Sequence, residues 1–199
     1  MDSTDSNTPR ILVIGAQGQI GQDLTLALRA RYGSQQVVAA DIRPGNALDG
    51  PAVVLDATDE LALRELVQQY QITQIYHLAA ILSAKGEQQP GLAWDLNMGS
   101  LLNVLEVAKQ EQVNKVFWPS SIAVFGPSTP KDQTPQMTIT DPNTIYGISK
   151  LAGERWCEYY WEHYGVDVRS LRFPGLISYS SPPGGGTTDY AVDIFHAAL

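Results

Sequence analysis

The sequence contains a single cysteine, Cys157, so the chain cannot form a disulfide with itself. Cysteine usage therefore gives no indication of an oxidising compartment. Cys157 falls in an aromatic segment with helical spacing, where we expect a small apolar side chain rather than a reactive thiol. The sequence also lacks a cluster of residues at metal-ligand spacing, and we expect no metal site.

Long apolar runs are missing as well, since no stretch approaches the roughly 20 residues that cross a bilayer. Residues 1–9 are polar and carry two aspartates, a pattern that excludes a signal peptide and disfavours a transit peptide. We therefore expect a flexible segment over residues 1–9, a cytoplasmic location and no membrane partner.

Positive charge is scarce, because 13 Lys and Arg residues face 21 Asp and Glu residues and leave a net charge of −8 at pH 7. Proteins that bind a phosphate backbone through bulk electrostatics carry the opposite charge balance. The composition therefore argues against a nucleic-acid partner.

The 199 residues, of which 44% are hydrophobic, are enough for one buried core. Short runs rich in valine and isoleucine alternate with longer segments of helical periodicity. We expect strands at residues 11–14, 37–40, 53–55, 75–78, 116–118 and 168–172, and helices at residues 19–32, 59–70 and 100–112. Near-continuous apolar strands separated by helices indicate a parallel sheet covered on both faces. The predicted fold class is α/β, a doubly wound parallel sheet of the Rossmann type.

Residues 126–145 and 178–188 break this alternation, and segments of that length are usually functional or disordered. A helical pattern follows and runs to the last residue without a stop signal; its apolar face consists of Ala191, Ile194, Phe195, Ala198 and Leu199. We therefore expect a truncated chain. Residues 10–176 would form the Rossmann domain, and residues 177–199 would begin a C-terminal lobe.

A glycine-rich turn lies between the first strand and the first helix. Gly15 suits a tight turn, Gly18 lets the backbone touch a pyrophosphate, and Gly21 allows close packing of helix on strand. The helix N-terminus supplies free N–H donors for the anion. The predicted dinucleotide site includes Gln17, Gln19 and Ile20 of the same turn.

Acidic residues follow the second and third strands. Asp41 can accept hydrogen bonds from the two ribose hydroxyls of an adenosine and would repel a 2′-phosphate, which favours NAD over NADP. Arg43, two residues after Asp41 and beyond Ile42, could instead meet a 2′-phosphate. Asp56, followed by Ala57, is placed to reach an adenine amino group. NAD is the predicted cofactor.

Small residues follow the fourth strand, where a cofactor would lie against the sheet; they are Leu78, Ala79 and Ala80. We interpret His77, which precedes them, as a structural residue.

Ser121, Tyr146 and Lys150 form the predicted catalytic group. Ser121 follows the fifth strand at the edge where α/β proteins bind ligands, and Tyr146 and Lys150 share one helix face. A phenol has a pKa of about 10, and a cation about 4 Å away at an effective dielectric of about 20 contributes roughly 4 kcal/mol. The Lys150 ammonium and the positive nicotinamide ring could therefore make Tyr146 a general base. Lys150 can also bind the nicotinamide ribose, and Ser121 would hydrogen-bond the substrate oxygen.

In this chain order, the motifs resemble the extended branch of the short-chain dehydrogenase/reductase family over essentially the whole chain. Three further segments resemble the threonine-oxidising members of that family: residues 119–127, 169–177 and 183–191. The resemblance implies that NAD oxidises the C3 hydroxyl of L-threonine, giving 2-amino-3-oxobutyrate and NADH. It also implies a further substrate lobe beyond residue 199.

The same resemblance assigns further contacts. Ser83 and the loop Gly186, Thr187 and Thr188 would contact the amino acid together with Ser121 and Tyr146. Pro174 and Leu176 would border the nicotinamide, and Asn97 would support the site from its helix.

Two other functions stay open at this point. A nucleotide-sugar epimerase would use the same three catalytic residues, and a non-catalytic dinucleotide sensor would keep the glycine turn but need neither Tyr146 nor Lys150. A dehydratase is disfavoured because Ile122 and Ala123 stand where it would need an acidic pair. The aromatic residues of 159–164 suggest a homodimer formed by two helices from each subunit.

Overall fold

The fold is described by a computed structural model that places residues 8–45, 49–176, 190, 191 and 194. Within these residues six strands form one parallel sheet in the order β3-β2-β1-β4-β5-β7. The strands are β1 (Ile11–Ile14), β2 (Val37–Asp41), β3 (Ala52–Val54), β4 (Gln74–His77), β5 (Lys115–Phe117) and β7 (Val168–Arg169). The order reverses between β1 and β4, as it does in doubly wound sheets, so the predicted fold class is confirmed.

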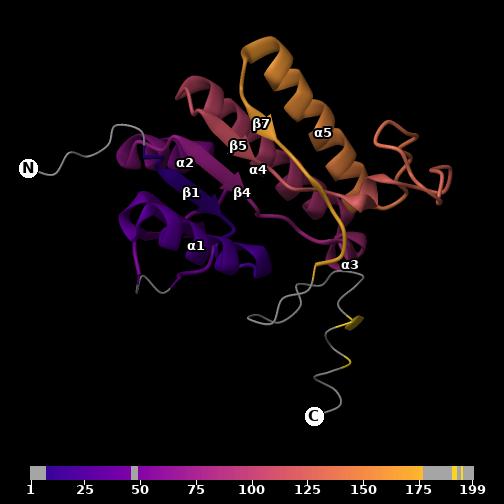
Figure 1. Ribbon diagram of the computed structural model, residues 1–199, viewed down its shortest axis with the longest axis horizontal. Helices are drawn as coiled ribbons and strands as arrows, with labels where there is room; N and C mark the ends of the chain where they lie inside the picture. Colours follow the sequence, from indigo (N-terminus) through magenta and orange to yellow (C-terminus); the bar gives the residue numbers. More distant parts are fainter. Residues whose placement is uncertain (1–7, 46–48, 177–189, 192–193, 195–199) are drawn as a thin grey trace, which may run out of the picture.

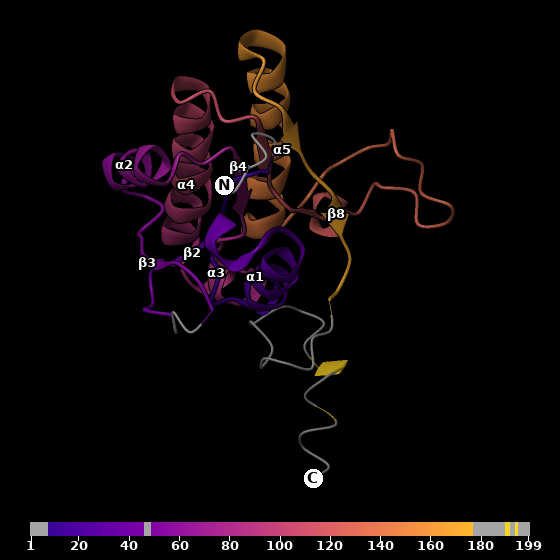
Figure 2. The same ribbon diagram turned by 60° about the vertical axis from the view of Figure 1, so that its left-hand side comes forward.

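Helices cover both faces of the sheet (Figure 1). The helical segments are α1 (Gln19–Tyr32), η1 (Ser34–Gln36), α2 (Glu60–Tyr70), α3 (Ser83–Gln88), α4 (Pro90–Gln110), η2 (Ile122–Val124) and α5 (Ile145–Tyr164). Figure 2 shows α2, α4 and α5 side by side in one layer, with α1 on the other side of the sheet. Among the described residues no helix is both long and apolar enough to span a membrane.

The apolar side chains of β1 alternate between two cores. Leu12 and Ile14 belong to the cluster shared with α2, α4 and α5, whereas Ile11 and Val13 face α1. All four side chains are buried. A strand that is buried on both faces consists of a continuous run of apolar residues, which explains why β1 could be predicted from the sequence.

Several predicted boundaries differ from the structure. Asp59 caps α2 instead of joining it, because its side chain accepts a hydrogen bond from the Ala62 amide. Helix α4 begins at Pro90, ten residues before the predicted start, and proline suits a first helical position. Helix α3 was not predicted at all.

The single strand predicted at residues 168–172 is wrong. The segment is divided between β7, which pairs with β5, and β8 (Arg172–Phe173), which pairs with β6 (Ser120–Ser121) in a separate parallel sheet. The chain therefore leaves the main sheet after Arg169. The irregular segment predicted at 126–145 lies outside the main body (Figure 1), although Ile145 already belongs to α5. Segment 178–188 and most of the C-terminal helical pattern lie outside the described residues.

The contact between the start of α1 and the glycine turn should tolerate no added methyl group. A Cβ at position 21 would lie 2.1 Å from the Gly15 carbonyl oxygen, so Gly21→Ala should destabilise the protein by about 3 kcal/mol. Gly99→Ala in α4 is the matched control, because its Cβ meets no atom within 4 Å and should be neutral or stabilising. Urea unfolding without cofactor measures both; equal stabilities of the two variants would contradict the packing argument.

Candidate active site

The glycine turn packs between the end of β2 and the segment that follows β4. Gly15 has φ +84°, in the left-handed region that favours glycine, and a Cβ there would lie 2.7 Å from the Ala79 amide nitrogen. The amides of Gly15 and Ala16 both donate to the Ala40 carbonyl, at 2.9 and 3.0 Å. The turn is therefore fixed against both β2 and the segment after β4.

The start of α1 forms a surface that suits a diphosphate. Gly18 is the N-cap residue, no side chain caps the helix, and no acidic residue lies in its first turn. Because Gly21 has no side chain, the start of α1 lies in close contact with Gly15. The first backbone N–H groups of a helix have no partner within the helix and can bind an anion. Gln19 and Ile20, at the start of the helix, are half-buried.

Asp41 ties the end of β2 to the glycine turn. Its buried carboxylate accepts hydrogen bonds from the Gln17 amide at 2.9 Å and from the Arg43 amide at 3.0 Å. The Arg43 guanidinium lies 3.4 Å from the same carboxylate and donates to the Gln17 carbonyl at 2.9 Å. The positive charge that could have met a 2′-phosphate is therefore paired with Asp41, while Ile42 is exposed.

Asp56 lies in the turn that follows β3 and Leu55. Its carboxylate accepts hydrogen bonds from the amide and the hydroxyl of Thr58, which lower the pKa of Asp56. Asn103 of α4 donates to the carbonyls of Ala57 and Thr58 and fixes this turn. Asp41, the last residue of β2, and Asp56, two residues after β3, thus lie at the ends of neighbouring strands at the carboxyl edge of the sheet.

The start of α5 is packed closely on the segment that carries Ser121. Thr144 caps the helix by accepting a hydrogen bond from the Gly147 amide, and a Cβ on Gly147 would lie 2.2 Å from the Ala123 carbonyl oxygen. The Ser121 side chain accepts from the Ala123 amide at 3.1 Å and is hydrogen-bonded to Tyr146. This close approach brings the predicted serine and tyrosine together.

Lys150 completes the group from one turn further along α5. Its ammonium donates to the Pro119 carbonyl at 2.6 Å and lies 4.3 Å from the centre of the Trp118 ring and 5.5 Å from the Tyr146 ring. The side chain is 4% exposed, and burial lowers its pKa to about 7. The structure therefore brings all three predicted catalytic residues together.

From the sequence we predict that Lys150, together with the nicotinamide ring, lowers the pKa of Tyr146. The residues of the chain alone do not lower it. Burial raises the pKa of Tyr146, and the hydrogen bond with Ser121 offsets this only in part. The reason is that burial disfavours the charged form of the phenol, and the nearby Lys150 ammonium, which donates to the Pro119 carbonyl, is itself disfavoured by burial.

His77 lies beneath this group, with Nε2 at 3.0 Å from the Ser100 hydroxyl and no partner for Nδ1 among the described residues. Burial and the charge of Lys150 lower the pKa of His77 to about 3, so the imidazole is neutral. This placement agrees with a structural role. Cys157 is also buried, and burial raises the pKa of its thiol to about 12, as suits a small apolar side chain.

The segment after β4 is held in place beside the site. Asn97 of α4 accepts a hydrogen bond from the Ile81 amide at 2.7 Å and donates to the Ile81 carbonyl at 3.1 Å. Ser83 begins α3, which packs on the start of α5 through a hydrogen bond from the Ile145 amide to Glu87. Leu78, Ala79 and Ala80, which precede this segment, are half-buried.

The segment after β8 approaches the start of α1. The Gln19 amide group lies 3.5 Å from the Leu176 carbonyl, which places Pro174 and Leu176 across the edge from the glycine turn. Gly186, Thr187 and Thr188 lie outside the described residues. Two charged residues beside the catalytic group, Glu154 and Arg172, were not predicted, although Glu154 follows Lys150 at helical spacing and could have been noticed.

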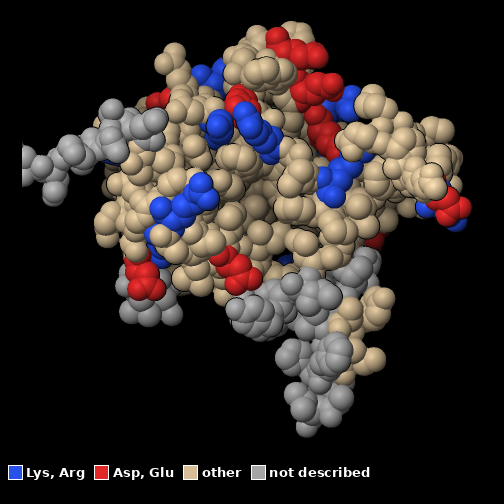
Figure 3. Space-filling model, in the orientation of Figure 1, with Lys and Arg blue, Asp and Glu red and all other residues tan. Residues whose placement is uncertain are grey.

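The face of the molecule shown in Figure 3 carries no single large patch of one charge. On the face shown in Figure 3, acidic and basic side chains lie in separate small groups on a mainly uncharged surface. Within the described residues no group of three or more His, Cys, Asp or Glu could hold a metal ion. Charge at the site thus comes from individual residues and from the N-terminus of α1.

Residues 11–194 match the NAD dependent epimerase/dehydratase family, and the chain belongs to this family. It is therefore a member of the extended short-chain dehydrogenase/reductases, as the motifs predicted, and the predicted cofactor is that of the family.

Three individual proteins are more similar to this chain than the family description alone conveys. A partial-consensus L-threonine 3-dehydrogenase is 61% identical, with a TM-score of 0.93, and the match covers 96% of this chain and 62% of that one. The GalE-like L-threonine dehydrogenase of Cupriavidus necator is 59% identical, with a TM-score of 0.93 and coverages of 96% and 62%. An uncharacterized epimerase/dehydratase of Staphylococcus saprophyticus is 53% identical over 194 residues, which are 96% of this chain and 60% of the relative. The chain thus spans about three fifths of the length of these relatives.

Replacing the buried lysine should change how stability depends on pH. The pKa of Lys150 falls from 10.5 to about 7 on folding, so the folded state binds fewer protons than the unfolded state between these values. Stability rises with pH in that window and is lost as pH falls towards 7. Between about pH 7 and about pH 8.5 the wild type should gain roughly 1.5 kcal/mol relative to Lys150→Met.

Urea unfolding at the two pH values measures this difference. The other two titratable groups coupled to Lys150, His77 and Cys157, have pKa values of about 3 and about 12 and do not titrate there in the folded state. Lys109→Met is the control, because Lys109 pairs with Glu106 at the surface and should leave the pH slope unchanged. Identical slopes for Lys150→Met and the wild type would show that burial of this ammonium costs nothing.

Proposed function

We propose that the intact protein is an NAD-dependent L-threonine 3-dehydrogenase that oxidises the C3 hydroxyl of L-threonine to 2-amino-3-oxobutyrate. The observation that carries the proposal is the convergence of Ser121, Tyr146 and Lys150 at the sheet edge, facing a glycine turn. The 59% identity to the L-threonine dehydrogenase of Cupriavidus necator supports threonine as the substrate.

The cofactor would lie along the carboxyl edge of the sheet. Gly15 and Gly21 would suit its diphosphate because they let the turn pack on the segment after β4 and the start of α1 pack on the turn, which leaves the N-terminus of α1 available to an anion. Asp41 would accept hydrogen bonds from the hydroxyls of the adenosine ribose, and Asp56 would approach the amino group of the adenine. Pro174 and Leu176, across the edge, would border the nicotinamide.

The chemistry of this chain's residues is a proton transfer coupled to loss of a hydride. When bound, NAD accepts the hydride from C3 and adds positive charge beside the phenol. Tyr146, as the phenolate, removes the hydroxyl proton, so the C3–O bond becomes a carbonyl as the C3–H bond breaks. Ser121 donates a hydrogen bond to the substrate oxygen, and Lys150 stabilises the phenolate.

The domain division remains part of the proposal. Residues 10–176 would bind the dinucleotide, and residues 177–199 would begin the substrate-binding lobe. Ser83, at the start of α3, would contact the amino acid together with Ser121 and Tyr146.

A nucleotide-sugar epimerase is the second candidate, because the 53% identical relative from Staphylococcus saprophyticus carries an epimerase/dehydratase description. Both reactions would use the same three residues. The full-length protein decides between them: NADH formation from NAD and threonine supports the dehydrogenase, and turnover of a UDP-sugar without NADH formation supports the epimerase.

Tyr146→Phe should lower kcat of the full-length enzyme by about 100-fold or more, because it removes the proton acceptor. NAD affinity should change little, since the glycine turn and Asp41 lie on other elements. NADH absorbance gives the rate, and Tyr70→Phe at the end of α2 is the matched control. Full activity in Tyr146→Phe would exclude Tyr146 as the proton acceptor, whereas a wild type that binds NAD but turns over neither threonine nor a UDP-sugar would favour a non-catalytic dinucleotide sensor.

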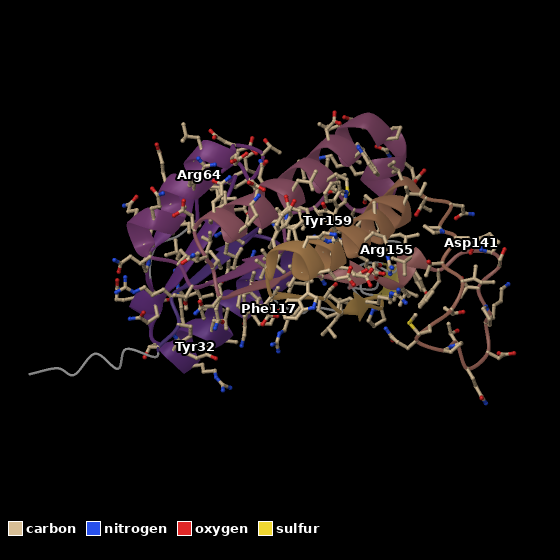
Figure 4. All side chains as sticks on the ribbon, turned by 90° about the horizontal axis from the view of Figure 1, so that it is seen from above. Tyr32, Arg64, Phe117, Asp141, Arg155 and Tyr159 are labelled. Carbon is tan, nitrogen blue, oxygen red and sulfur yellow. The ribbon has the colours of Figure 1, made fainter. Side chains whose placement is uncertain are left out.

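A homodimer through α5 is also proposed. The side chains of Trp156, Tyr159, Trp161 and Tyr164 are 41%, 41%, 56% and 47% exposed. Trp156, Tyr159 and Tyr164 line a hollow of about 700 Å³ together with Arg155. Figure 4 labels Tyr159 and Arg155 on α5. A cluster of exposed aromatic residues of this kind is typical of a protein–protein interface.

Tyr159→Arg should convert the full-length protein from dimer to monomer in sedimentation equilibrium, because it places a charge in the aromatic hollow. Leu61→Arg, at an exposed leucine of α2, should leave the dimer intact. A wild-type protein that sediments only as a monomer would exclude this interface.

A further inference from the structure

A second, very short sheet carries one residue of the catalytic group. Strands β6 and β8 contain two residues each, and Ser120 lies opposite Arg172 while Ser121 lies opposite Phe173. Figure 2 shows β8 beside α5. Side chains alternate along a strand, so Ser120 points away from the side on which Ser121 meets Tyr146. Two paired residues cannot hold such a sheet in place alone.

Glu154 of α5 connects both of these strands. One carboxylate oxygen accepts a hydrogen bond from the Ser120 hydroxyl at 2.6 Å and another from Arg172 Nε at 2.8 Å. The other oxygen accepts from Arg172 Nη2 at 2.8 Å. The Arg172 contact is bidentate, which fixes direction as well as distance. We call Ser120, Glu154 and Arg172 the clamp.

The clamp is attached to the same helix as the proposed base. Glu154 lies one turn beyond Lys150 and two turns beyond Tyr146. The neighbouring Gly153 packs tightly on Trp118, since a Cβ there would lie 2.3 Å from the indole ring. Helix α5 therefore lies in close contact with the segment that leads into β6, and Glu154 approaches both short strands from this helix.

The ion pair is well shielded, with the Arg172 and Glu154 side chains 19% and 12% exposed. Burial raises the pKa of Glu154, but the hydrogen bonds from Arg172 and Ser120 more than offset it, and the net pKa is lowered. The same contact raises the pKa of Arg172. Both groups are charged at neutral pH, and removing one leaves the other as an uncompensated charge.

We propose that Glu154 is a positioning residue, which through Ser120 and Arg172 holds Ser121 and the segment containing Pro174 at their working distance from Tyr146 and Lys150. Glu154 reaches neither substrate nor cofactor in this role. The consequence for turnover rests on the proposed function, whereas the consequence for the geometry of β6 and β8 does not.

The experiment compares Glu154→Gln with the wild type in the full-length protein. Glutamine keeps the size and one acceptor but places an amide NH₂ against the Arg172 guanidinium, so the bidentate contact is lost. We expect kcat to fall by about 10- to 100-fold, because small displacements of a catalytic group have effects of that size. NAD affinity should stay within about twofold, since the glycine turn lies on other elements. Ser120→Ala, which removes one neutral hydrogen bond, should have a smaller effect of the same kind.

Hydrogen–deuterium exchange supplies a readout that needs no turnover. In Glu154→Gln the amides of residues 119–125 and 171–176 should exchange faster, and those of residues 11–45 should not. Asp167→Asn is the matched control, because Asp167 also makes a bidentate pair with an arginine, Arg169, but away from β6 and β8. It should leave both kcat and the exchange of these two segments unchanged.

The outcomes separate the two proposals. A wild type inactive on threonine, together with the expected exchange pattern, removes the dehydrogenase proposal and supports the clamp. An active wild type with unchanged kcat and exchange in Glu154→Gln overturns the clamp. A uniform rise in exchange over the whole domain, with kcat per folded molecule retained, also overturns it, because Glu154 would then serve stability alone.

Discussion

The burial of β1 on both faces is the constraint on which the rest of the structure depends. Because its four side chains alternate between two cores, helices must cover both sides, and such cover is typical of a sheet whose strands run parallel, as β2 and β4 do beside β1. Parallel strands end at one edge, so the glycine turn, Asp41 and the segment after β4 meet there without any sequence proximity. The reversal of strand order between β1 and β4 opens that edge for a ligand. The site is thus a consequence of how the core is filled.

Close backbone contacts then determine how the helix starts and turns are placed at the carboxyl edge of the sheet. Gly21 and Gly147 each let a helix start press against a carbonyl oxygen, at Gly15 and Ala123. The first contact gathers free N–H donors, and the second joins Tyr146 to Ser121. At both positions a glycine in the first turn of a helix packs against a backbone carbonyl oxygen. The same kind of contact therefore occurs at the predicted cofactor site and at the predicted catalytic group. Apolar cores alone could not give this precision, because they specify volumes rather than atomic positions.

The sequence predicted those features that depend on local pattern. Helix α1 has the predicted bounds, because the glycine turn marks its start and Gly33 its end. The first half of α4 was missed because its buried residues include Asn97, a polar residue that holds the Ile81 backbone and interrupts the apolar stripe. The division of residues 168–172 between two sheets depends on pairing with Ser120 and Ser121, which no local pattern reveals. The grouping of Ser121, Tyr146 and Lys150 could be predicted from their spacing. Their protonation could not, because burial of Lys150 depends on the Pro119 and Trp118 environment.

The contrast between Lys150 and Glu154 explains how one helix can serve both chemistry and structure. The two residues lie one turn apart and are both largely buried, yet burial lowers the pKa of the lysine to about 7, whereas three hydrogen bonds keep the glutamate ionised. A charge with a single carbonyl partner stays sensitive to a further charge placed nearby, but a charge with a bidentate partner does not. Lys150 can therefore respond when a phenolate or a ribose approaches, while Glu154 holds its neighbours in place regardless of what is bound. A responsive cation needs such a rigid frame, since a proton acceptor that moved with its supporting strand would lose the alignment on which hydride and proton transfer depend.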